Sequence, residues 1–568
     1  MPSEKPKHSS QFRFRRFLNW FPMGLTYAFL YMGRYNLTVS KNALGDLMSK
    51  ADFGTIFAAG TITYAFSFLI NGPLTDKIGG KRGMLIGAAG AALMNILMGV
   101  LTYFMLNTTA HFNIALWFSI IYAANMYFQS YGAVSIVKVN SNWFHIRERG
   151  VFGGIFGILI SLGLYFAFDW GQLIVNATVA TPKDLNFVQK LLRSLLAIDG
   201  SSGMDQTWWV FFIPAFILGL FFLIELFLLK DKPSDAHYED FDTGDASSGE
   251  MDKKFNLKEI LVKILTNKII ITIAIIEFCS GVMRNGIMHW YLIFTNDMGY
   301  VRDFFMKVHW GLLLMLAGVF GGMFAGVISD KVFGSRRGPV AALLYGFMLV
   351  STLIMWPLVT STNNEVKEGF KVVVRHDLVD KFAAEHNLSV PFIKEKISEK
   401  YKVELMDSSA QQTIWRVYSE NSRDMIATHI ASIELIEYER YNRFKKETEI
   451  LRIAVKDVAD VLGAPSDTRS YLLGFIVVFM SLCVIGVHGM LSGTSTMDFG
   501  GRRAAATAVG LIDGFVYLGT GVQSLALGFL TTQNWNFWPP FLIPFAVPGL
   551  ILAIKIWYAF PQSKSKEK

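Results

Sequence analysis

The chain has 568 residues, of which 52% are hydrophobic and 17% are charged, with a net charge of +8 at neutral pH. This composition is typical of a polytopic membrane protein and not of a soluble domain. The basic residues lie in short segments between apolar runs, which excludes the continuous basic face of a nucleic-acid-binding protein. Cys279 and Cys483 lie inside apolar segments, so the sequence predicts neither a disulfide framework nor a metal cluster.

The amino-terminal half, residues 1–230, contains six apolar segments that are long enough to cross a bilayer, for which about 20 residues suffice. Basic clusters precede the first segment and follow the second, the fourth and the sixth, so the positive-inside rule predicts a cytoplasmic amino terminus. We expect no cleavable signal peptide, because the basic amino terminus leads into a full-length span. The six predicted spans cover approximately residues 21–44, 55–75, 84–106, 112–138, 150–175 and 207–230.

A polar, acidic segment, residues 231–265, separates this half from residues 266–568 and predicts a cytoplasmic linker. The carboxyl-terminal half repeats the plan, so we expect an all-α protein with twelve transmembrane helices in two pseudo-symmetric halves and both termini in the cytoplasm. Its predicted spans cover approximately residues 266–294, 307–329, 338–360, 471–494, 503–530 and 537–560.

A polar insertion, residues 361–469, interrupts the carboxyl-terminal half between its third and fourth spans, and the topology predicts that it is extracytoplasmic. Within residues 409–462 apolar side chains recur at helical spacing, which predicts a helical hairpin. We expect residues 176–206 to add a shorter cap on the same face. The apolar residues at helical spacing include Ile426, Ile430, Ile433 and Ile436.

One short motif occurs twice, as GPLTDKIGGKR after the second span and as GVISDKVFGSRR after the eighth. Its glycines permit a tight turn and a close approach of helices, and its acid can accept hydrogen bonds from the amino terminus of a neighbouring helix. An ordinary cytoplasmic loop is the simpler interpretation, but a repeat in register favours a conformational role. The residues concerned are Gly72, Asp76, Gly79, Arg82, Gly326, Asp330 and Arg336.

Two arginines, Arg34 and Arg284, lie inside the first span of each half. A charged side chain at bilayer depth costs on the order of 3 kcal/mol on insertion scales, so it normally faces a cavity or a partner. A guanidinium group remains charged and can bind phosphate oxygens through two nitrogens at once. Two such groups at the midplane predict a site for a doubly charged anion. The alternative is that each arginine only pairs with a buried acid, such as Glu277 or Asp513.

Polar and aromatic residues beside these arginines are candidates to line the same site. Tyr35 follows Arg34, Gln129 lies midway along the fourth span, and His289 and Trp290 follow Arg284. Such groups can bond phosphate or sugar hydroxyls, although packing is the simpler interpretation of most aromatic residues in this chain. Glu277, His289 and Asp513 are the candidates to carry a proton or to couple charge, since an unperturbed histidine titrates near neutral pH.

The repeated motif GPLTDKIGGKR resembles the loop between helices 2 and 3 of the major facilitator superfamily. More narrowly, the chain is similar to the organophosphate:phosphate antiporters, which include bacterial glycerol-3-phosphate and hexose-phosphate transporters. The resemblance covers nearly all of the chain except the insertion. The similar segments are YMGRYNLTVSKNAL, NWFHIRERG, MRNGIMHW and RRAAATAVGLIDGFVYLGTG.

This resemblance implies an alternating-access carrier in which Arg34 and Arg284 bind the phosphate group of the substrate. We expect a monomer in the lipid bilayer of a plasma or bacterial inner membrane, without a cofactor. The chain departs from the family pattern at three places. Phe68 stands where the family has a lysine, His289 where it commonly has an acid, and Ile160 where the glycerol-3-phosphate members have a histidine.

The sequence therefore predicts a carrier that exchanges an organic phosphate, such as glycerol-3-phosphate or a sugar phosphate, for inorganic phosphate. Two alternatives remain open, which are a proton-coupled carrier of another organic anion and a membrane sensor of sugar phosphate. The sequence contains no catalytic triad, phosphate-cradling glycine loop or metal-ligand spacing, so we expect neither an enzyme nor an ATP-driven pump.

Overall fold

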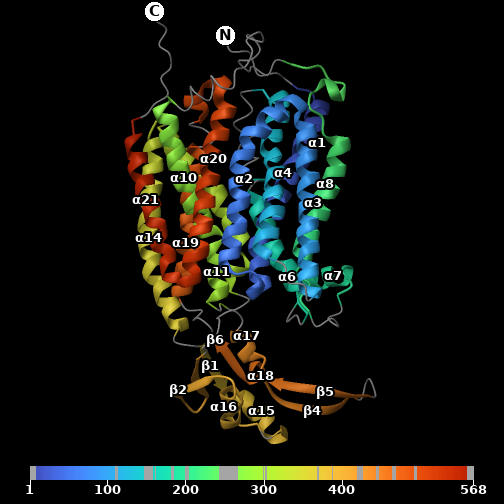
Figure 1. Ribbon diagram of the computed structural model, residues 1–568, viewed down its shortest axis with the longest axis vertical. Coiled ribbons are helices and arrows are strands. Elements are labelled where there is room, and N and C mark those ends of the chain that lie inside the picture. Colours follow the sequence, from blue (N-terminus) through green and yellow to red (C-terminus); the bar gives the residue numbers. More distant parts are fainter. Residues whose placement is uncertain are drawn as a thin grey trace, which may run out of the picture. The chain divides into compact units, whose positions relative to one another are not determined.

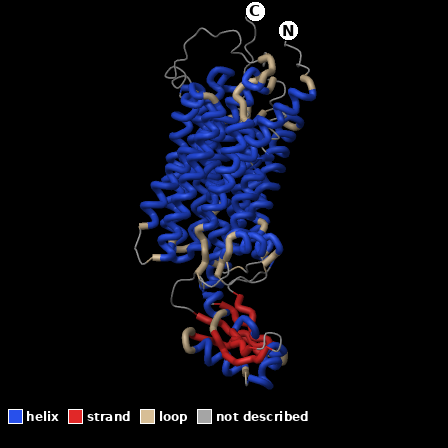
Figure 2. The backbone as a smooth tube through the Cα atoms, turned by 90° about the vertical axis from the view of Figure 1, so that its right-hand side faces the viewer, coloured by secondary structure: helices blue, strands red, loops and turns tan. Residues whose placement is uncertain are grey.

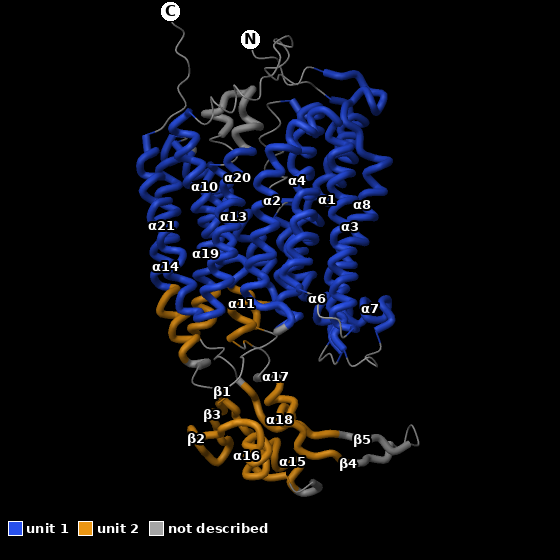
Figure 3. Tube along the Cα trace, viewed as in Figure 1, with its two compact units in different colours: residues 1–290, 308–354, 475–568 blue, residues 291–307, 355–474 orange. Residues whose placement is uncertain are grey.

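The computed structural model describes most of the chain, in two compact units (Figure 3). Unit 1 contains residues 1–290, 308–354 and 475–568, and unit 2 contains residues 291–307 and 355–474. The residues outside the description are 1–7, 109–112, 146–157, 160, 181–184, 199–203, 242–265, 299, 301–303, 335, 368–369, 387, 419–425, 443–446, 463–467, 492–495 and 559–568.

The amino-terminal half of unit 1 is helical (Figure 1). Polar side chains begin its helices, since Ser9, Ser49 and Asn113 each accept a hydrogen bond from a backbone N–H group of the first turn. A π-helical turn, η2, interrupts the fifth span. The elements are α1 (Ser10–Leu44), α2 (Lys50–Ile78), α3 (Gly80–Asn107), α4 (Ile114–Trp143), η2 (Phe166–Trp170), α6 (Gly171–Thr178), α7 (Phe187–Leu195) and α8 (Trp209–Leu228).

The carboxyl-terminal half is also built from long helices, and Asn267 caps the first of them. Two of these helices, α14 and α19, continue from unit 1 into unit 2. The elements are α10 (Lys268–Met288), α11 (Trp290–Asp297), α12 (Phe305–Val308), α13 (Trp310–Lys331), α14 (Arg337–Lys367), α19 (Thr468–His488), α20 (Thr496–Gln533) and α21 (Trp538–Lys555), and a 3-10 turn, η6 (Trp535–Phe537), precedes α21.

Among the described residues, nine helical segments are long and apolar enough to cross a membrane, and each coincides with a predicted span. The other three predicted spans correspond to α1, to α4 and to the segment that contains η2 and α6. The prediction of an all-α membrane bundle is therefore confirmed, apart from the insertion. The nine segments are 50–78, 80–107, 209–228, 268–297, 310–329, 337–364, 468–491, 510–533 and 535–555.

Helices from the two halves pack directly against each other in unit 1. α2 lies beside α20, although their sequences are far apart, and α20 also packs against α10 (Figure 1). Within the amino-terminal half, α4 packs against α2 and α3. α2 and α20 therefore form a principal contact between the two halves.

The insertion has a mixed α/β structure, and the predicted helical hairpin is wrong (Figure 2). Four antiparallel strands form a sheet in the order β2-β3-β1-β6, and β4 pairs with β5 in a separate two-stranded ladder. Short helices accompany them. The strands are β1 (Phe370–Arg375), β2 (Lys402–Ser408), β3 (Gln412–Tyr418), β4 (Glu434–Asn442), β5 (Glu447–Ala454) and β6 (Ala459–Leu462); the helices are α15 (His376–His386), α16 (Val390–Ser398), α17 (Ile426–Ala431) and α18 (Val455–Val458).

The isoleucines that predicted the hairpin lie in three different places, since Ile433 falls in the turn between a short helix and a strand. Ile426 and Ile430 lie in the short helix α17, whereas Ile436 lies in β4. The segment QTIWRVY of β3 alternates between buried and half-buried positions, which is the period of a strand. The helical spacing spans too few turns to decide the structure, and β-branched and aromatic residues favour strand pairing instead.

The insertion also has a hydrophobic core of its own. Its members come from the strands and from the short helices packed on them, and Val372, Trp415 and Val417 are at most 2% exposed. At its base Arg469 of α19 donates a hydrogen bond to Ser361 of α14, with 2.9 Å between Nη1 and Oγ. This contact brings together the two helices from which the insertion emerges.

A short amphipathic helix, α7, lies within residues 176–206, where the sequence predicts a cap. Asn186 and Gln189 form a capping box at its start. Arg193 donates hydrogen bonds to the backbone carbonyls of Ala177 and Val179, so the helix is tied to the end of α6.

Candidate functional site

Arg34, on α1, is fully buried and donates hydrogen bonds to three side chains. Its Nε atom lies 2.9 Å from Oε1 of Gln129, Nη2 lies 2.9 Å from the hydroxyl of Tyr64, and Nη1 lies 3.3 Å from the hydroxyl of Tyr517. These partners come from α4, α2 and α20, so both halves contribute to the site. All three are uncharged, and the positive charge of Arg34 has no carboxylate among these hydrogen-bond partners.

Amide side chains fix the backbone around Arg34. Asn125 of α4 and Asn95 of α3 both donate to the carbonyl oxygen of Gly33, at 3.0 and 3.1 Å. Gln129 donates in turn to Asn125, and the Tyr122 hydroxyl donates to the carbonyl oxygen of Arg34. Buried polar groups that are linked in this way hold one geometry, so the guanidinium group is preorganised.

Arg284, on α10, approaches the same tyrosine cluster from the carboxyl-terminal half. The Arg34 guanidinium lies 4.8 Å from the ring of Tyr31 and 5.8 Å from that of Tyr35, and the charge of Arg284 acts on the same tyrosines and on Tyr517. The Nε atom of Arg284 is buried and has no hydrogen-bond partner among the described residues. A buried guanidinium donor without a partner is costly, and a bound anion would satisfy it.

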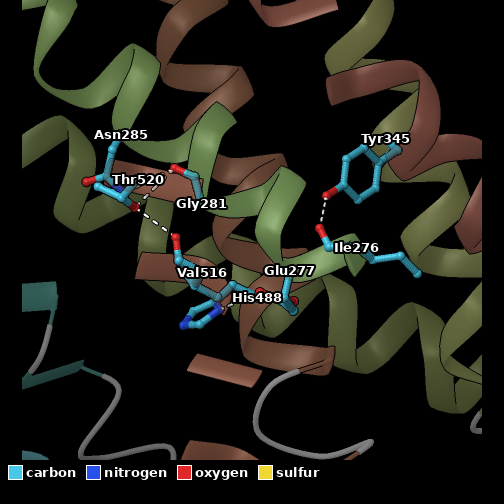
Figure 4. Close-up of polar contacts among 8 residues, drawn as sticks. All are labelled: Ile276, Glu277, Gly281, Asn285, Tyr345, His488, Val516 and Thr520. Carbon is cyan, nitrogen blue, oxygen red and sulfur yellow. Dashed lines mark hydrogen bonds and ion pairs between the residues drawn. The ribbon is translucent and has the colours of Figure 1, made fainter. Parts of the chain in front are cut away.

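Glu277 and Asp513, the acids considered as ion-pair partners of the arginines, lie on α10 and α20. Glu277 is fully buried, but its Oε2 atom lies 2.8 Å from Nδ1 of His488, at the end of α19 (Figure 4). Asp513 lies partly buried on α20, one turn before Tyr517. For Arg284, the interpretation as half of a buried ion pair with Glu277 is therefore not supported.

Tyr35, His289 and Trp290 lie in an aromatic layer between the halves. His289 is buried, with 2.7 Å between its Nδ1 atom and the hydroxyl of Thr38, and its ring lies 4.9 Å from that of Tyr35. Trp290 packs edge-on against Phe53 at 5.8 Å. Tyr35 therefore lies next to Arg34, whereas His289 and Trp290 lie farther along the same aromatic layer.

Tyr64, Tyr517 and His488 were not among the residues that the sequence selected for the site. Tyr64 and Tyr517 are in edge-on contact at 4.5 Å, and both bond Arg34. Phe68, which stands where the family has a lysine, packs against Tyr64 at 4.6 Å. A polar residue inside an apolar span was the only sequence signal for Tyr64, Tyr517 and His488.

The first copy of the repeated motif ends α2 and begins α3. Gly79 has a φ of +92°, a conformation that favours glycine. The acid that accepts from the start of α3 is Asp231, whose Oδ1 atom lies 2.8 Å from the N–H nitrogen of Lys81. Asp76 instead pairs with Lys138 at 2.7 Å, so the expectation for Asp76 is corrected. Arg82 is exposed, and Gly72 has open space around it.

The second copy of the motif ends α13 and reaches the start of α14. The backbone carbonyl of Phe333 accepts a hydrogen bond from Nε of Arg336 at 3.1 Å, and Gly334 has a φ of +56°. Gly326 has open space around it. The side chain of Asp330 lies outside the described part of the chain, as does Ile160.

Contacts at one end of the bundle join the halves beyond the arginines. The carboxylate of Asp169, in η2, accepts hydrogen bonds from the backbone N–H groups of Gly311 and Leu312, at 2.6 and 3.4 Å. These groups begin α13, so a carboxylate from one half caps a helix of the other. Together with the bond between Thr38 and His289, this contact joins the two halves at the end where α1 finishes and α2 starts.

The model of the Major Facilitator Superfamily matches residues 23–364. A probable hexose phosphate transport protein of Chlamydia trachomatis is 26% identical over 61% of this chain and 71% of its own length. The glycerol-3-phosphate transporter of Bacillus subtilis is 25% identical over 58% of this chain and 68% of its own length, and the membrane sensor protein UhpC of Escherichia coli is 23% identical over 62% and 74%.

Among solved structures, an inward-facing, unoccupied bacterial homologue of the human lysosomal transporter Spinster aligns with a TM-score of 0.59. The alignment covers 98% of this chain and 100% of that chain at 12% identity. A D-xylose-proton symporter aligns with a TM-score of 0.53 at 10% identity, covering 96% and 98%. At these identities the similarity establishes the fold alone.

Proposed function

Because the chain belongs to the Major Facilitator Superfamily, we propose that it is a secondary transporter that exchanges an organic phosphate for inorganic phosphate by alternating access. The observation that carries this proposal is the shared tyrosine cluster of Arg34 and Arg284. One arginine comes from each half, and the charges of both act on Tyr31, Tyr35 and Tyr517. The named relatives that transport hexose phosphate and glycerol-3-phosphate support the same class of substrate.

The two arginines suit a phosphate ester chemically. A phosphate ester carries up to two negative charges, which would neutralise both guanidinium groups, and each guanidinium can bond two phosphate oxygens. A bound phosphate would supply the missing partner of the Arg284 Nε atom and draw the halves together. An empty carrier would have to move two uncompensated charges through its closed state, which favours exchange over net transport.

The exchange is tested with purified protein in liposomes that are loaded with inorganic phosphate. We expect uptake of glycerol-3-phosphate, a hexose phosphate or phosphoglycerate to depend on internal phosphate, and glycerol and glucose to be ignored. Each matched pair differs only in the phosphate group, so the comparison isolates its recognition. Uptake that proceeds equally well without internal phosphate would contradict exchange.

A membrane sensor of sugar phosphate is the second candidate, because a relative with that printed name is similar over 62% of the chain. A sensor would bind the ester without moving it. Binding to protein in detergent without counterflow in liposomes would favour the sensor over the carrier. Uptake driven by a proton gradient instead of internal phosphate would favour a proton-coupled carrier of an organic anion.

We expect the insertion to be dispensable for exchange. The test replaces residues 368–467 with a short Gly/Ser linker, which retains Ser361, Arg469 and their hydrogen bond. Because the insertion has its own core, at least about half of the wild-type exchange rate should remain. Complete loss of exchange in a folded deletion variant would assign the insertion a role in gating or in substrate delivery.

We also propose that the protein acts as a monomer in a plasma or bacterial inner membrane, with both termini in the cytoplasm. The pattern of basic segments supports this orientation. In this orientation the contact between Asp169 and the start of α13 lies on the extracytoplasmic side.

A further inference from the structure

We propose that Glu277 and His488 form a proton-binding pair that couples proton uptake to anion binding at Arg284. The inference rests on the proposed function, because the anion at Arg284 is the second ligand of the coupling. Neither the sequence pattern nor the likeness to other proteins assigns a role to His488. The pair is built from α10 and α19 of the carboxyl-terminal half.

The geometry joins a fully buried carboxylate to a partly exposed imidazole (Figure 4). The Glu277 side chain is 0% exposed and that of His488 is 25% exposed, with 2.8 Å between Oε2 and Nδ1. The second oxygen of Glu277, Oε1, is buried and has no hydrogen-bond partner among the described residues. Within this pair, His488 is therefore the partly exposed member and Glu277 the buried one.

The titratable groups around the pair lie on α10, α14, α19 and α20, while α13, which packs against α19 at Gly486, has no titratable residue between positions 310 and 329. Within range of Glu277, α10 contributes Cys279 and Arg284, and α14 contributes Tyr345. The Tyr345 hydroxyl donates to the backbone carbonyl of Ile276 at 2.6 Å (Figure 4), so it does not bond the carboxylate. On the remaining neighbours, α19 carries Cys483, α20 carries Asp513 and Tyr517, and α21 has no titratable residue before Lys555.

Among these neighbours, Arg284 carries the permanent positive charge that senses the state of the pair. When neutral His488 donates from Nδ1 to the carboxylate, the pair has a net charge of −1 and partly compensates Arg284. Uptake of one proton at the second ring nitrogen, Nε2, brings the pair to zero. Arg284 is then left with its full charge for an incoming anion, so proton uptake strengthens anion binding.

The reverse must hold by linkage, since a bound anion favours the protonated pair by the same factor. The net charge of the loaded site is also closer to zero when the pair carries the proton. Two arginines, a doubly charged phosphate and a charged pair sum to −1, whereas the proton brings the loaded site to zero. A site without net charge crosses the closed state at lower electrostatic cost.

The test measures the Kd of inorganic phosphate for purified full-length protein between about pH 5.5 and pH 8.5, the range in which histidines titrate. Dividing the Kd of each variant by the Kd of the wild type at the same pH removes the effect of the titration of phosphate itself. Glu277→Gln fixes the pair without negative charge, so it should bind about fivefold more tightly than the wild type at pH 8.5 and equally at pH 5.5.

His488→Gln should have the opposite effect, because it removes the imidazole nitrogen that takes up the proton in the wild-type pair. It should match the wild type at pH 8.5 and bind about fivefold more weakly at pH 5.5. His376→Gln is the matched control, since His376 bonds Thr413 within the insertion, and its ratio to the wild type should be constant with pH.

Constant ratios for both pair variants would overturn the coupling and leave the phosphate site intact. Failure of the wild type to bind any phosphate would overturn the proposed function, and the coupling with it. If Glu277→Gln does not fold, the pH dependence of His488→Gln alone decides, because His488 is a quarter exposed and tolerates the change of side chain.

Discussion

Replacing Arg34 or Arg284 with lysine is expected to lower phosphate exchange about 100-fold or more and to leave the protein folded. Arg34 donates from Nε, Nη1 and Nη2 to side chains on three helices, and a single ammonium nitrogen cannot reproduce that pattern. Losing two hydrogen bonds of a charged group, at about 1.5–3 kcal/mol each, accounts for a change of this size. Exchange rates in liposomes measure it directly.

Two measurements separate loss of the site from loss of the fold. Thermal unfolding of each variant should remain cooperative, because lysine keeps the charge and most of the length of the side chain. Arg375→Lys is the matched control, since Arg375 lies in the insertion, half exposed, 3.7 Å from Asp460. Exchange at the wild-type rate in either site variant would remove the phosphate site from the proposed mechanism.

Replacing Gly54 with valine is expected to reduce exchange at least tenfold by preventing the halves from closing. A Cβ atom at Gly54 of α2 would lie 2.3 Å from the carbonyl oxygen of Ser524 and 2.9 Å from the Cα atom of Gly528, both on α20. Backbone atoms cannot rotate away, so the two helices would have to separate. Overpacking of this kind costs about 1–3 kcal/mol or more, which suffices to displace a conformational equilibrium.

Two other glycines provide matched controls. Gly346, on α14, has open space around it, so Gly346→Val should exchange normally. Gly281→Val should instead lower the yield of folded protein, because its Cβ atom would lie 2.0 Å from the carbonyl oxygen of Val516 within one half. Normal exchange by Gly54→Val would indicate that α2 and α20 need not close during transport.

The sequence by itself determined the membrane architecture of this protein. Length and apolarity of a segment decide whether it crosses a bilayer, and both are local properties. Nine predicted spans therefore correspond to described helices of sufficient length and hydropathy. Arg34 and Arg284 could be singled out for the same reason, since a charge inside an apolar span is costly wherever its partners lie.

The partners of those charges were decided only by the tertiary structure. Arg34 bonds Tyr517 from the other half, and Glu277 bonds His488 instead of an arginine. Such pairs join residues that are hundreds of positions apart, and no local period encodes them. The structure of the insertion was also decided by tertiary contacts. The isoleucine spacing favoured a helix, but β4 (434–442) pairs with β5 (447–454) as two strands. Periodicity predicts which face of a segment is buried, but the contacts available in the folded chain decide what that face meets.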